Sequence, residues 1–387
     1  GLIDKLTNTV KQNNFNITLK PIWQLSKKWQ LSTNFDYALN KINEDNYRPK
    51  DYTAEKFVDG IGLTHNSRGS QVMRNTSLFN DLRGLYKTKI EQLDLVAIAG
   101  NRFRTNRFES DYLIGYNSGS NTSINLPGSF SYLRSDGTNN NQTTISNYLN
   151  LDWTYDNRYF LTMTTSLDAS SRFGSQTQSG LSVLGVDWAV SPAVSASWLV
   201  SSEQFMKKVR LVSLLKLRAG YGITGNDDIK DYQTEAYFTG VRFKGVYNGM
   251  VLSNLANPKI QWERTARANA GVDVAFLDDR LNLSIDVYSS VTNHLLVQKQ
   301  FQDAVGLNSY WTNDGKLGNK GFELTMNAKM MNLSAFHWEL GASVGHYRNE
   351  ILALSGDPIH TKVLDGEVIT QVGSAAGLFY GYKTEGV

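Results

Sequence analysis

The 387-residue chain contains no cysteine, only 6 prolines and no long hydrophobic run. Without cysteine it has no disulfide, no thiolate metal site and no cysteine nucleophile. A membrane-spanning helix needs about 20 consecutive, mainly apolar residues, and no stretch of the sequence approaches that length. The sequence therefore excludes a helical membrane protein, and any crossing of a membrane must be made by strands.

The chain also lacks a large excess of charge of either sign. The chain has 39 Lys+Arg and 36 Asp+Glu, a net charge of +3. Nucleic-acid-binding proteins usually carry a basic stripe, so we expect no nucleic-acid partner. Hydrophobic residues make up 41% of the chain and the mean hydropathy is −0.36. A transmembrane barrel carries apolar side chains at every second position only, so this average fits a barrel as well as a soluble protein.

What the sequence does contain is strict alternation of apolar and polar residues. From Trp29 to Leu39 the odd positions carry mainly apolar or aromatic side chains and the even positions mainly polar ones, which is the two-residue period of a strand. Similar runs flank short polar turns at Asp156-Asn157-Arg158 and Asp278-Asp279-Arg280, where Asp bonds the local backbone. About six such hairpins predict an all-β protein with about twelve strands, each near the ~9–11 residues of a tilted membrane strand.

Aromatic side chains flank several of the short turns, as in the aromatic girdles of outer-membrane barrels. We expect membrane-interface aromatics at Trp23, Trp29, Trp153, Tyr155, Tyr159, Phe336 and Trp338. Long connections alternate with the short turns, at residues 41–70, 105–142, 174–187, 225–260, 300–318 and from 351 onward, and the Asn/Ser/Gly-rich residues 117–141 are the clearest loop. We therefore expect part of a large antiparallel transmembrane β-barrel with short periplasmic turns and long extracellular loops.

The sequence contains no convincing catalytic or metal-binding pattern. The five histidines are far apart and form no HExxH-type spacing. No G-x-S-x-G elbow lies between a strand and a helix, so we expect no enzyme, no cofactor and no metal. Asn226, Asp227, Asp228 and Asp231 offer oxygen ligands for Ca²⁺ but lack EF-hand spacing, and a solvated loop is the favoured interpretation.

Several phrases resemble the barrel of SusC/RagA-type TonB-dependent transporters. They are NLDWTYDNRYFL at 150–161, SSRFG at 170–174, SPAVSASW at 191–198, EQFMK at 203–207, LKLRAGYGITGND at 215–227, QWERT at 261–265 followed by Asn269, Gly271 and Asp273, residues 281–288, GNKGFEL at 318–324 and GYKTEG at 381–386. The first 145 residues match mainly in pattern. Two departures are Leu167-Asp168-Ala169, where the family tends to have Arg-Asp-Gly, and Arg267, where an uncharged polar residue is common.

The resemblance implies an outer-membrane barrel of about 22 strands from Bacteroidetes-type bacteria. It implies a plug domain, a SusD-like lipoprotein lid and energy from the TonB complex. Neither end of the chain reads as a closing strand, so residues 1–387 are expected to be a barrel segment without signal peptide, plug domain or C-terminal strands. The remaining strands, the plug and outer-membrane lipid would then be its neighbours.

Import of a bulky oligosaccharide or peptide is the expected function. Two alternatives stay open: a SusC-like barrel that serves as a structural subunit of a larger outer-membrane machine, and a soluble β-rich adhesin or enzyme. Soluble sandwiches and β-helices also alternate, although they rarely alternate short and long connections so regularly.

Two groups of side chains are candidates for contacts inside such a transporter. Loop aromatics could present flat apolar faces to a sugar or peptide, or could pack against other loops or a lid: Tyr237, Phe238, Phe243, Tyr247, Tyr310 and Trp311. Polar residues on the non-lipid face of predicted strands would line the lumen or form salt bridges to the plug: Lys216, Arg218, Asp273, Asp286 and Glu323.

Overall fold

A computed structural model describes most of the chain. The described residues are 7–50, 55–58, 60–118, 130–174, 176–177, 180–183, 185–243, 247–300, 309–333, 335–363 and 366–381. Apart from two short 3₁₀ segments, the regular structure in these ranges consists of strands. None of the described segments is a helix of the length and apolarity needed to cross a membrane.

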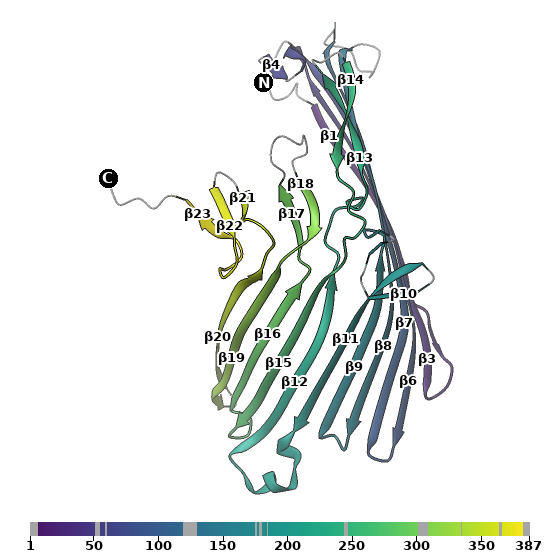
Figure 1. Ribbon diagram of the computed structural model, residues 1–387. Helices are drawn as coiled ribbons and strands as arrows, with labels where there is room; N and C mark the ends of the chain where they lie inside the picture. The colour runs from purple at the N-terminus through teal and green to yellow at the C-terminus, as the bar shows by residue number, and fades with distance from the viewer. Residues whose placement is uncertain are drawn as a thin grey trace.

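Twelve strands of the described residues follow one another in a single antiparallel sheet (Figure 1). They are β1 (Thr7–Leu19), β3 (Trp29–Arg48), β6 (Ser67–Ile90), β7 (Leu93–Ser118), β8 (Phe130–Tyr155), β9 (Tyr159–Ser170), β11 (Val186–Leu199), β12 (Val212–Asn226), β15 (Glu263–Phe276), β16 (Leu281–Asn293), β19 (Lys316–Leu333) and β20 (Phe336–Ala353). Two short strands, β2 (Ile22–Gln24) and β10 (Gly180–Val183), pair with β3 and β11. The predicted all-β fold and the count of about twelve strands are confirmed.

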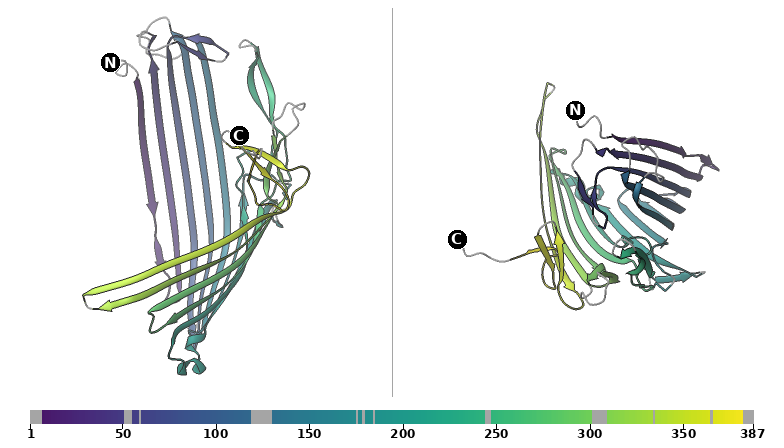
Figure 2. Two further views of the ribbon diagram at one scale, coloured as in Figure 1. Left: turned by 90° about the vertical axis from the view of Figure 1, so that its left-hand side faces the viewer. Right: turned by 90° about the horizontal axis from the view of Figure 1, so that it is seen from above.

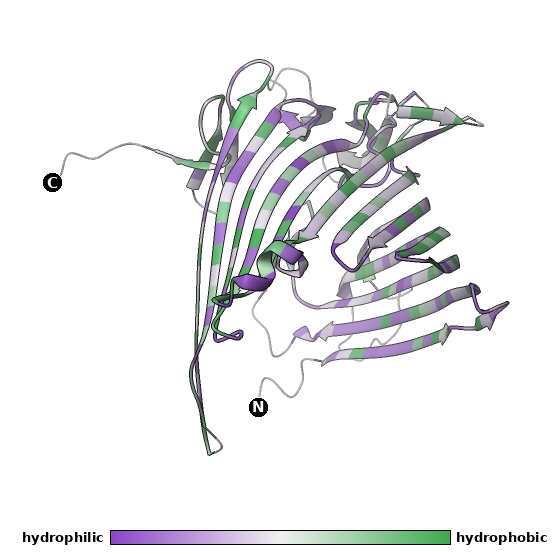
Figure 3. Cartoon of the chain, turned by 90° about the horizontal axis from the view of Figure 1, so that it is seen from below, coloured by the Kyte–Doolittle hydropathy of each residue, from purple (hydrophilic) through white to green (hydrophobic). Residues whose placement is uncertain are grey.

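The sheet has one apolar face and one polar face. On β16, Ile285 and Val287 belong to the apolar face and are 46% and 50% exposed, whereas the alternating residues Ser284 and Asp286 belong to the polar face. Hydrophobic and hydrophilic residues accordingly alternate along the strands of the curved sheet (Figure 3). A soluble protein would cover such an apolar face with a second layer, but here it is left exposed over much of the sheet, as in a lipid-facing barrel wall.

Short connections join the strands at one end of the sheet, the lower end in Figure 1. Asp156 and Asn157 have φ values of 52° and 51°, as expected for a tight hairpin turn in which both central residues are left-handed. Asp278 and Asp279, with φ values of 52° and 62°, serve the same purpose between β15 and β16. The β11–β12 connection is longer and contains η3 (Val200–Ser202) and η4 (Gln204–Lys208).

Three strands are much longer than expected. β6 has 24 residues and β7 and β8 have 26 each, which at ~3.3 Å per residue is about 80 Å. The interpretation of residues 117–141 as a loop was wrong for 117–118 and 130–141, because these residues belong to the paired strands β7 and β8, where Asn139, for example, pairs with Glu109. Ladder hydrogen bonds do not require apolar side chains, so the strands continue where the apolar pattern has ended. Residues 119–129 lie outside the described ranges.

The other long connections contain small hairpins. They are β4 (Lys56–Val58) with β5 (Gly62–Thr64), β13 (Tyr237–Phe243) with β14 (Tyr247–Asn254), β17 (Leu296–Gln300) with β18 (Ser309–Asn313), and β21 (Ile359–Val363), β22 (Gly366–Thr370) and β23 (Leu378–Tyr380). All of them lie at the end opposite the short turns (Figure 1). The left view of Figure 2 shows the first long strands rising beyond the level of β21–β23 at this end.

Candidate functional site

Polar side chains from four neighbouring strands meet on the polar face of the sheet. Lys216 and Arg218 are on β12, Asp273 on β15, Asp286 on β16 and Glu323 on β19. Lys216 pairs with Asp273, Arg218 and Asp286 both pair with Gly271, and Asp286 also pairs with Glu323. Directly paired residues share a face, so the structure brings the five predicted wall residues together.

Arg218 is the centre of this group. Its guanidinium donates to Asp273 through Nε (2.8 Å to Oδ2) and Nη2 (2.9 Å to Oδ1), and to Asp286 through Nη1 (3.0 Å to Oδ1) and Nη2 (3.1 Å to Oδ2). Ser284 donates to Asp273 over 2.8 Å. These residues, Arg218, Asp273, Ser284 and Asp286, are called the wall cluster below. Two bidentate carboxylate pairs hold one guanidinium in a fixed orientation.

Gly271 makes room for the Arg218 guanidinium. A Cβ atom on Gly271 would overlap Asp286 Oδ1 and would lie 2.9 Å from Arg218 Nη2. The guanidinium therefore lies flat along the wall, over the backbone of β15. The family phrases contain both residues, but their juxtaposition depends on the register between strands, which a single sequence does not show.

Two tyrosines cover glycines on the same face in the same way. A Cβ on Gly100 would lie 2.5 Å from the hydroxyl oxygen of Tyr148, and one on Gly321 would lie 2.5 Å from that of Tyr288. The guanidinium of Arg267 lies 4.6 Å from the ring centroid of Tyr288, close enough for a cation–π contact. Arg267, the departure from the family pattern, is thus part of the polar wall.

Hydrogen bonds continue across the polar face of earlier strands. Tyr148 donates to Asp81 over 2.7 Å, and Thr162 donates to Asp152 over 2.7 Å. Thr164 donates to Asn150 over 2.6 Å. These residues were not singled out from the sequence, although the alternation that predicted the wall cluster places them on the same face.

The six predicted loop aromatics lie on two different hairpins. Tyr237 and Phe238 begin β13 and are 40% and 61% exposed. Phe243 and Tyr247 pair through the backbone on either side of the β13–β14 turn; their side chains lie outside the described part of the structure. Tyr310 and Trp311 are half-buried on β18.

The hairpins that carry these aromatics belong to separate sheets. The segment after β14 is linked to β18 by a hydrogen bond of 2.9 Å, which the Asn257 side chain donates to the Trp311 carbonyl. The described rings, those of Tyr237, Phe238, Tyr310 and Trp311, therefore lie on two separate hairpins and form no single aromatic patch.

Three of the family-like phrases meet at the end of the sheet opposite the short turns. Arg172 forms an ion pair with Asp231 (3.1 Å) and donates to the Asp227 carbonyl (3.1 Å). The rings of Phe173 and Trp262 are 5.2 Å apart, and Trp262 is 8% exposed. These five residues are called the loop cluster below. Asp231, one of the acidic residues expected to be solvated, is thus paired with Arg172 of the SSRFG phrase.

Another cluster ties the β8–β9 turn to the β11–β12 connection. Glu203 accepts hydrogen bonds from the Tyr159 hydroxyl (2.7 Å), Trp198 Nε1 (3.1 Å) and Arg158 Nη1 (2.9 Å). These donors lower the pKa of Glu203, with Tyr159 contributing most. Arg158 also pairs with Asp156. Arg158, Tyr159, Trp198 and Glu203 are called the turn cluster below.

The predicted interface aromatics lie near the short-turn end of their strands. They end or begin strands beside these turns: Trp23, Trp29, Trp153, Tyr155, Tyr159, Phe336 and Trp338. Sequence reasoning missed two further rings, Tyr86, whose centroid is 4.7 Å from that of Trp29, and Trp198, which is 6.2 Å from Tyr159. Both could have been found from the same alternation, because they occupy apolar positions next to a turn.

The described residues contain no group of three or more His, Asp or Glu side chains placed to hold a metal ion. Two histidines instead have single carboxylate neighbours, His65 with Glu55 and His360 with Glu367, each at 2.7 Å. These pairs are on separate surface hairpins and do not form a common site.

Comparison with known proteins assigns the fold to a family. The model of the family "TonB dependent receptor-like, beta-barrel" matches residues 2–383. The TonB-dependent receptor P39 of Formosa agariphila is 31% identical over 365 residues, which are 91% of this chain and 32% of the relative. The TonB-dependent receptor SusC of Bacteroides thetaiotaomicron is 32% identical over 260 residues, which are 62% of this chain and 25% of the relative. The match spans about a third of the first of these relatives and a quarter of the second.

Solved structures agree with this assignment. The RagAB peptide transporter superimposes with a TM-score of 0.82 and 19% identity over 96% of this chain and 40% of that chain. The likeness confirms the fold, a wall of strands that belongs to a larger barrel. The named relatives are receptors and a transporter. The chain therefore belongs to the TonB-dependent receptor-like β-barrel family, among relatives of the SusC/RagA type.

Proposed function

We propose that this chain forms part of the barrel wall of an outer-membrane transporter that imports a bulky oligosaccharide or peptide. The observation that carries the proposal is the sheet with opposite faces, in which exposed apolar side chains such as Ile285 and Val287 suit lipid, whereas the wall cluster suits a water-filled lumen. Membership of a TonB-dependent family and similarity to the RagAB peptide transporter support import as the activity.

We further propose the partners that the family resemblance implies. A plug domain in the full-length transporter closes the lumen, the TonB complex moves the plug, and a SusD-like lipoprotein covers the extracellular side. In the closed state, salt bridges to the plug engage Lys216 and Glu323. Glu323 is exposed and directly opposite Asp286, and like charges placed opposite each other are destabilising, so a cationic plug residue would be favoured there.

The exposed rings of Tyr237 and Phe238 are proposed to contact the substrate, together with Phe243, Tyr247, Tyr310 and Trp311. Flat aromatic faces suit the apolar faces of sugars and peptide side chains. The β13 and β18 hairpins project at the end away from the short turns (Figure 1), where a substrate would arrive from outside the cell.

The test is an uptake assay in cells that express the full-length transporter. Fluorescent oligosaccharides and peptides are offered with TonB present and with TonB deleted. Accumulation of one of the two classes only when TonB is present is the expected result. A correctly inserted barrel that accumulates neither class, or that accumulates both equally without TonB, would overturn import and favour a structural subunit of a larger machine.

A second experiment separates substrate contact from structural packing. Tyr237→Ala and Phe238→Ala are expected to raise the substrate concentration needed for half-maximal uptake by about tenfold, since one aromatic stacking contact is worth roughly 1–1.5 kcal/mol. Phe57→Ala is the control, because Phe57 is 70% exposed on the separate β4–β5 hairpin. Equal effects of all three substitutions would show that these rings only pack the rim.

A further inference from the structure

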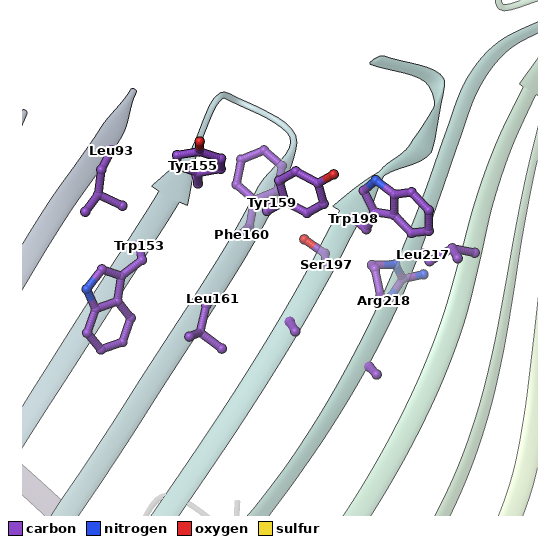
Figure 4. A pocket seen from close by; sticks show the side chains of 12 residues that line it. Leu93, Trp153, Tyr155, Tyr159, Phe160, Leu161, Ser197, Trp198, Leu217 and Arg218 are labelled. Atoms are coloured by element: carbon purple, nitrogen blue, oxygen red, sulfur yellow. The ribbon is translucent and has the colours of Figure 1, made fainter. Parts of the chain in front are cut away.

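The apolar face carries a groove beside the turn cluster. A cavity of about 680 Å³ is lined there by Trp153, Tyr155, Tyr159, Leu161, Trp198 and Leu217, among others (Figure 4). Its floor is formed by Ala196 and Ala219, which pair directly across β11 and β12. The groove exists because these two positions carry methyl groups while the neighbouring strands carry large rings.

The groove continues along the same strands. A second depression of about 360 Å³ is lined by Leu149, Leu151, Met163, Val194 and Tyr221, among others. These residues continue the row of side chains that lines the first cavity. Leu151 is two positions from Trp153 on β8, and Val194 is two positions from Ala196 on β11. The part of β8 between Leu149 and Tyr155 is about 20 Å long. At a strand tilt of about 45° this covers roughly 14 Å of depth, about one leaflet of a ~30 Å hydrocarbon core.

Basic and apolar residues lie together at the turn end of the groove. The β11–β12 connection leaves Phe205 and Leu211 63% and 58% exposed. Lys207, Lys208 and Arg210 are exposed in the same segment. Such a segment suits the boundary between acyl chains and anionic head groups, where apolar rings enter the membrane and cations attract phosphate.

The turn cluster holds this basic segment against the groove. Glu203 immediately precedes η4 and accepts hydrogen bonds from Tyr159 (2.7 Å) and Trp198 (3.1 Å), two of the residues that line the cavity. Lys207 and Lys208 follow Glu203 by four and five residues in the last turn of η4. The lysines are therefore tethered within a few residues of the aromatic rim.

We propose that the groove and these lysines form a binding site for one anionic glycerophospholipid of the periplasmic leaflet. One acyl chain lies on Ala196 and Ala219 between the aromatic walls, and the phosphate lies against Lys207 and Lys208. The inference rests on the proposed outer-membrane location. Bulk lipid would cover the rest of the apolar face, but here, within the part of the chain that the structure describes, an apolar groove lies beside a fixed cationic segment.

The test is native mass spectrometry of the full-length transporter after exchange into detergent with phosphatidylglycerol, phosphatidylethanolamine or phosphatidylcholine. One phosphatidylglycerol is expected to stay bound preferentially. Lys207→Gln and Lys208→Gln should each weaken its retention about fivefold, the effect of removing one cation near an anionic surface. The double variant Lys27→Gln/Lys28→Gln is the matched control, because these lysines are exposed at another short turn.

A second variant tests the groove itself. Ala196→Phe should abolish retention of phosphatidylglycerol by filling the floor, whereas Ala342→Phe, at an exposed apolar-face position of β20, should retain it. Equal retention of all three lipids, or equal effects of test and control variants, would overturn the proposal. So would a change of oligomeric state with Ala196→Phe, because a second copy would then cover the groove.

The outcomes also separate this inference from the proposed location. A folded barrel changes its gel mobility on heating, which is scored for every variant before lipids are counted. A protein recovered outside the outer membrane would contradict the location. A barrel that is inserted there but retains no phosphatidylglycerol would contradict the lipid site alone.

Discussion

Glycine at one position decides whether the wall cluster can form. Gly271→Ala places a Cβ against Asp286 Oδ1 and 2.9 Å from Arg218 Nη2, so the guanidinium must leave one of its carboxylates. Overpacking of this kind costs about 1–3 kcal/mol. We expect a lower temperature for the heat-induced change in gel mobility of the full-length barrel.

Gly84→Ala is the control for this substitution. It also adds a methyl group to a strand of the main sheet, but its Cβ would meet only the Ala99 carbonyl oxygen at 4.0 Å. If both variants melted at the same temperature, the space above Gly271 would have no part in stability.

For single residues, the face of the sheet that each side chain occupies could be predicted from the sequence, but the side chains that it contacts could not. Alternation placed Lys216, Arg218 and Asp273 on the polar face, and pairing in the sheet confirms that they share it. Bidentate contacts to both Asp273 and Asp286 depend on the register of three strands. A one-residue slip of any strand would have moved its side chain to the other face.

The β11–β12 connection should respond to pH through Glu203. Hydrogen bonds from Tyr159, Trp198 and Arg158 hold its pKa below the ordinary 4.5. A carboxylate with a lowered pKa stabilises the folded state above its unfolded-state pKa, and this contribution is lost as the pH falls through the folded-state value. We expect the thermal stability of the wild type to fall below about pH 4.5 by more than that of Glu203→Gln.

The measurement is the midpoint of thermal unfolding between pH 3 and pH 7, followed by tryptophan fluorescence. Glu91→Gln serves as control, because Glu91 is exposed in another short turn at the same end of the sheet. The pH dependence of the Glu91 variant should match that of the wild type. A Glu203 variant that also matched it would show that the turn cluster contributes nothing.

The β17–β18 hairpin is fastened by Asp314, which follows β18. Asp314 pairs with Lys299 of β17 and accepts a hydrogen bond of 2.9 Å from the Ser355 hydroxyl beyond β20. Burial works to raise the pKa of Asp314, but the bonds from Lys299 and Ser355 lower it overall.

Asp314→Asn removes the ion pair and should loosen this hairpin. We expect amide hydrogen exchange in β17 and β18 to become about fivefold faster, as for a loss of roughly 1 kcal/mol. Asp357→Asn, at an exposed position of the following connection, should leave the rates unchanged. Unchanged rates in both variants would mean that the strand ladder alone holds the hairpin.

Element lengths show where sequence reasoning stopped. The short turns were predicted because an apolar run lies on each side of them, whereas the outer parts of β6, β7 and β8 were missed. Where both faces of a strand meet water, the two-residue period in hydrophobicity disappears while the backbone ladder continues. The loop cluster was missed for a different reason, since it joins residues such as Arg172 and Asp231 from separate connections.

At the scale of the whole sheet, we expect β7 to pass from a lipid-exposed part to a water-exposed part within its length. Ala97 and Asp111 are on the same face of this strand, fourteen residues and about 46 Å apart, which exceeds the ~30 Å hydrocarbon core. Spin labels at Ala97 in the full-length transporter should collide with oxygen from the membrane. Labels at Asp111 should collide with a water-soluble nickel complex.

Ile98 supplies the control for the label at Ala97, because it is on the opposite face at the same depth. Its label should show low oxygen accessibility. A label at Asp111 that resembled the one at Ala97 would contradict the position of the membrane on the sheet and the extracellular continuation of β7.

The glycines of the polar wall have a consequence for anything that moves along it. Gly100, Gly271 and Gly321 let Tyr148, Arg218 and Tyr288 lie down on the backbone of the adjacent strand. The long side chains of this wall therefore lie flat along the sheet and do not project away from it. In the proposed transporter, a bulky solute that slides past would meet a smooth surface rich in charge and hydroxyl groups, and the bore would keep the width that upright arginine and tyrosine side chains would have taken.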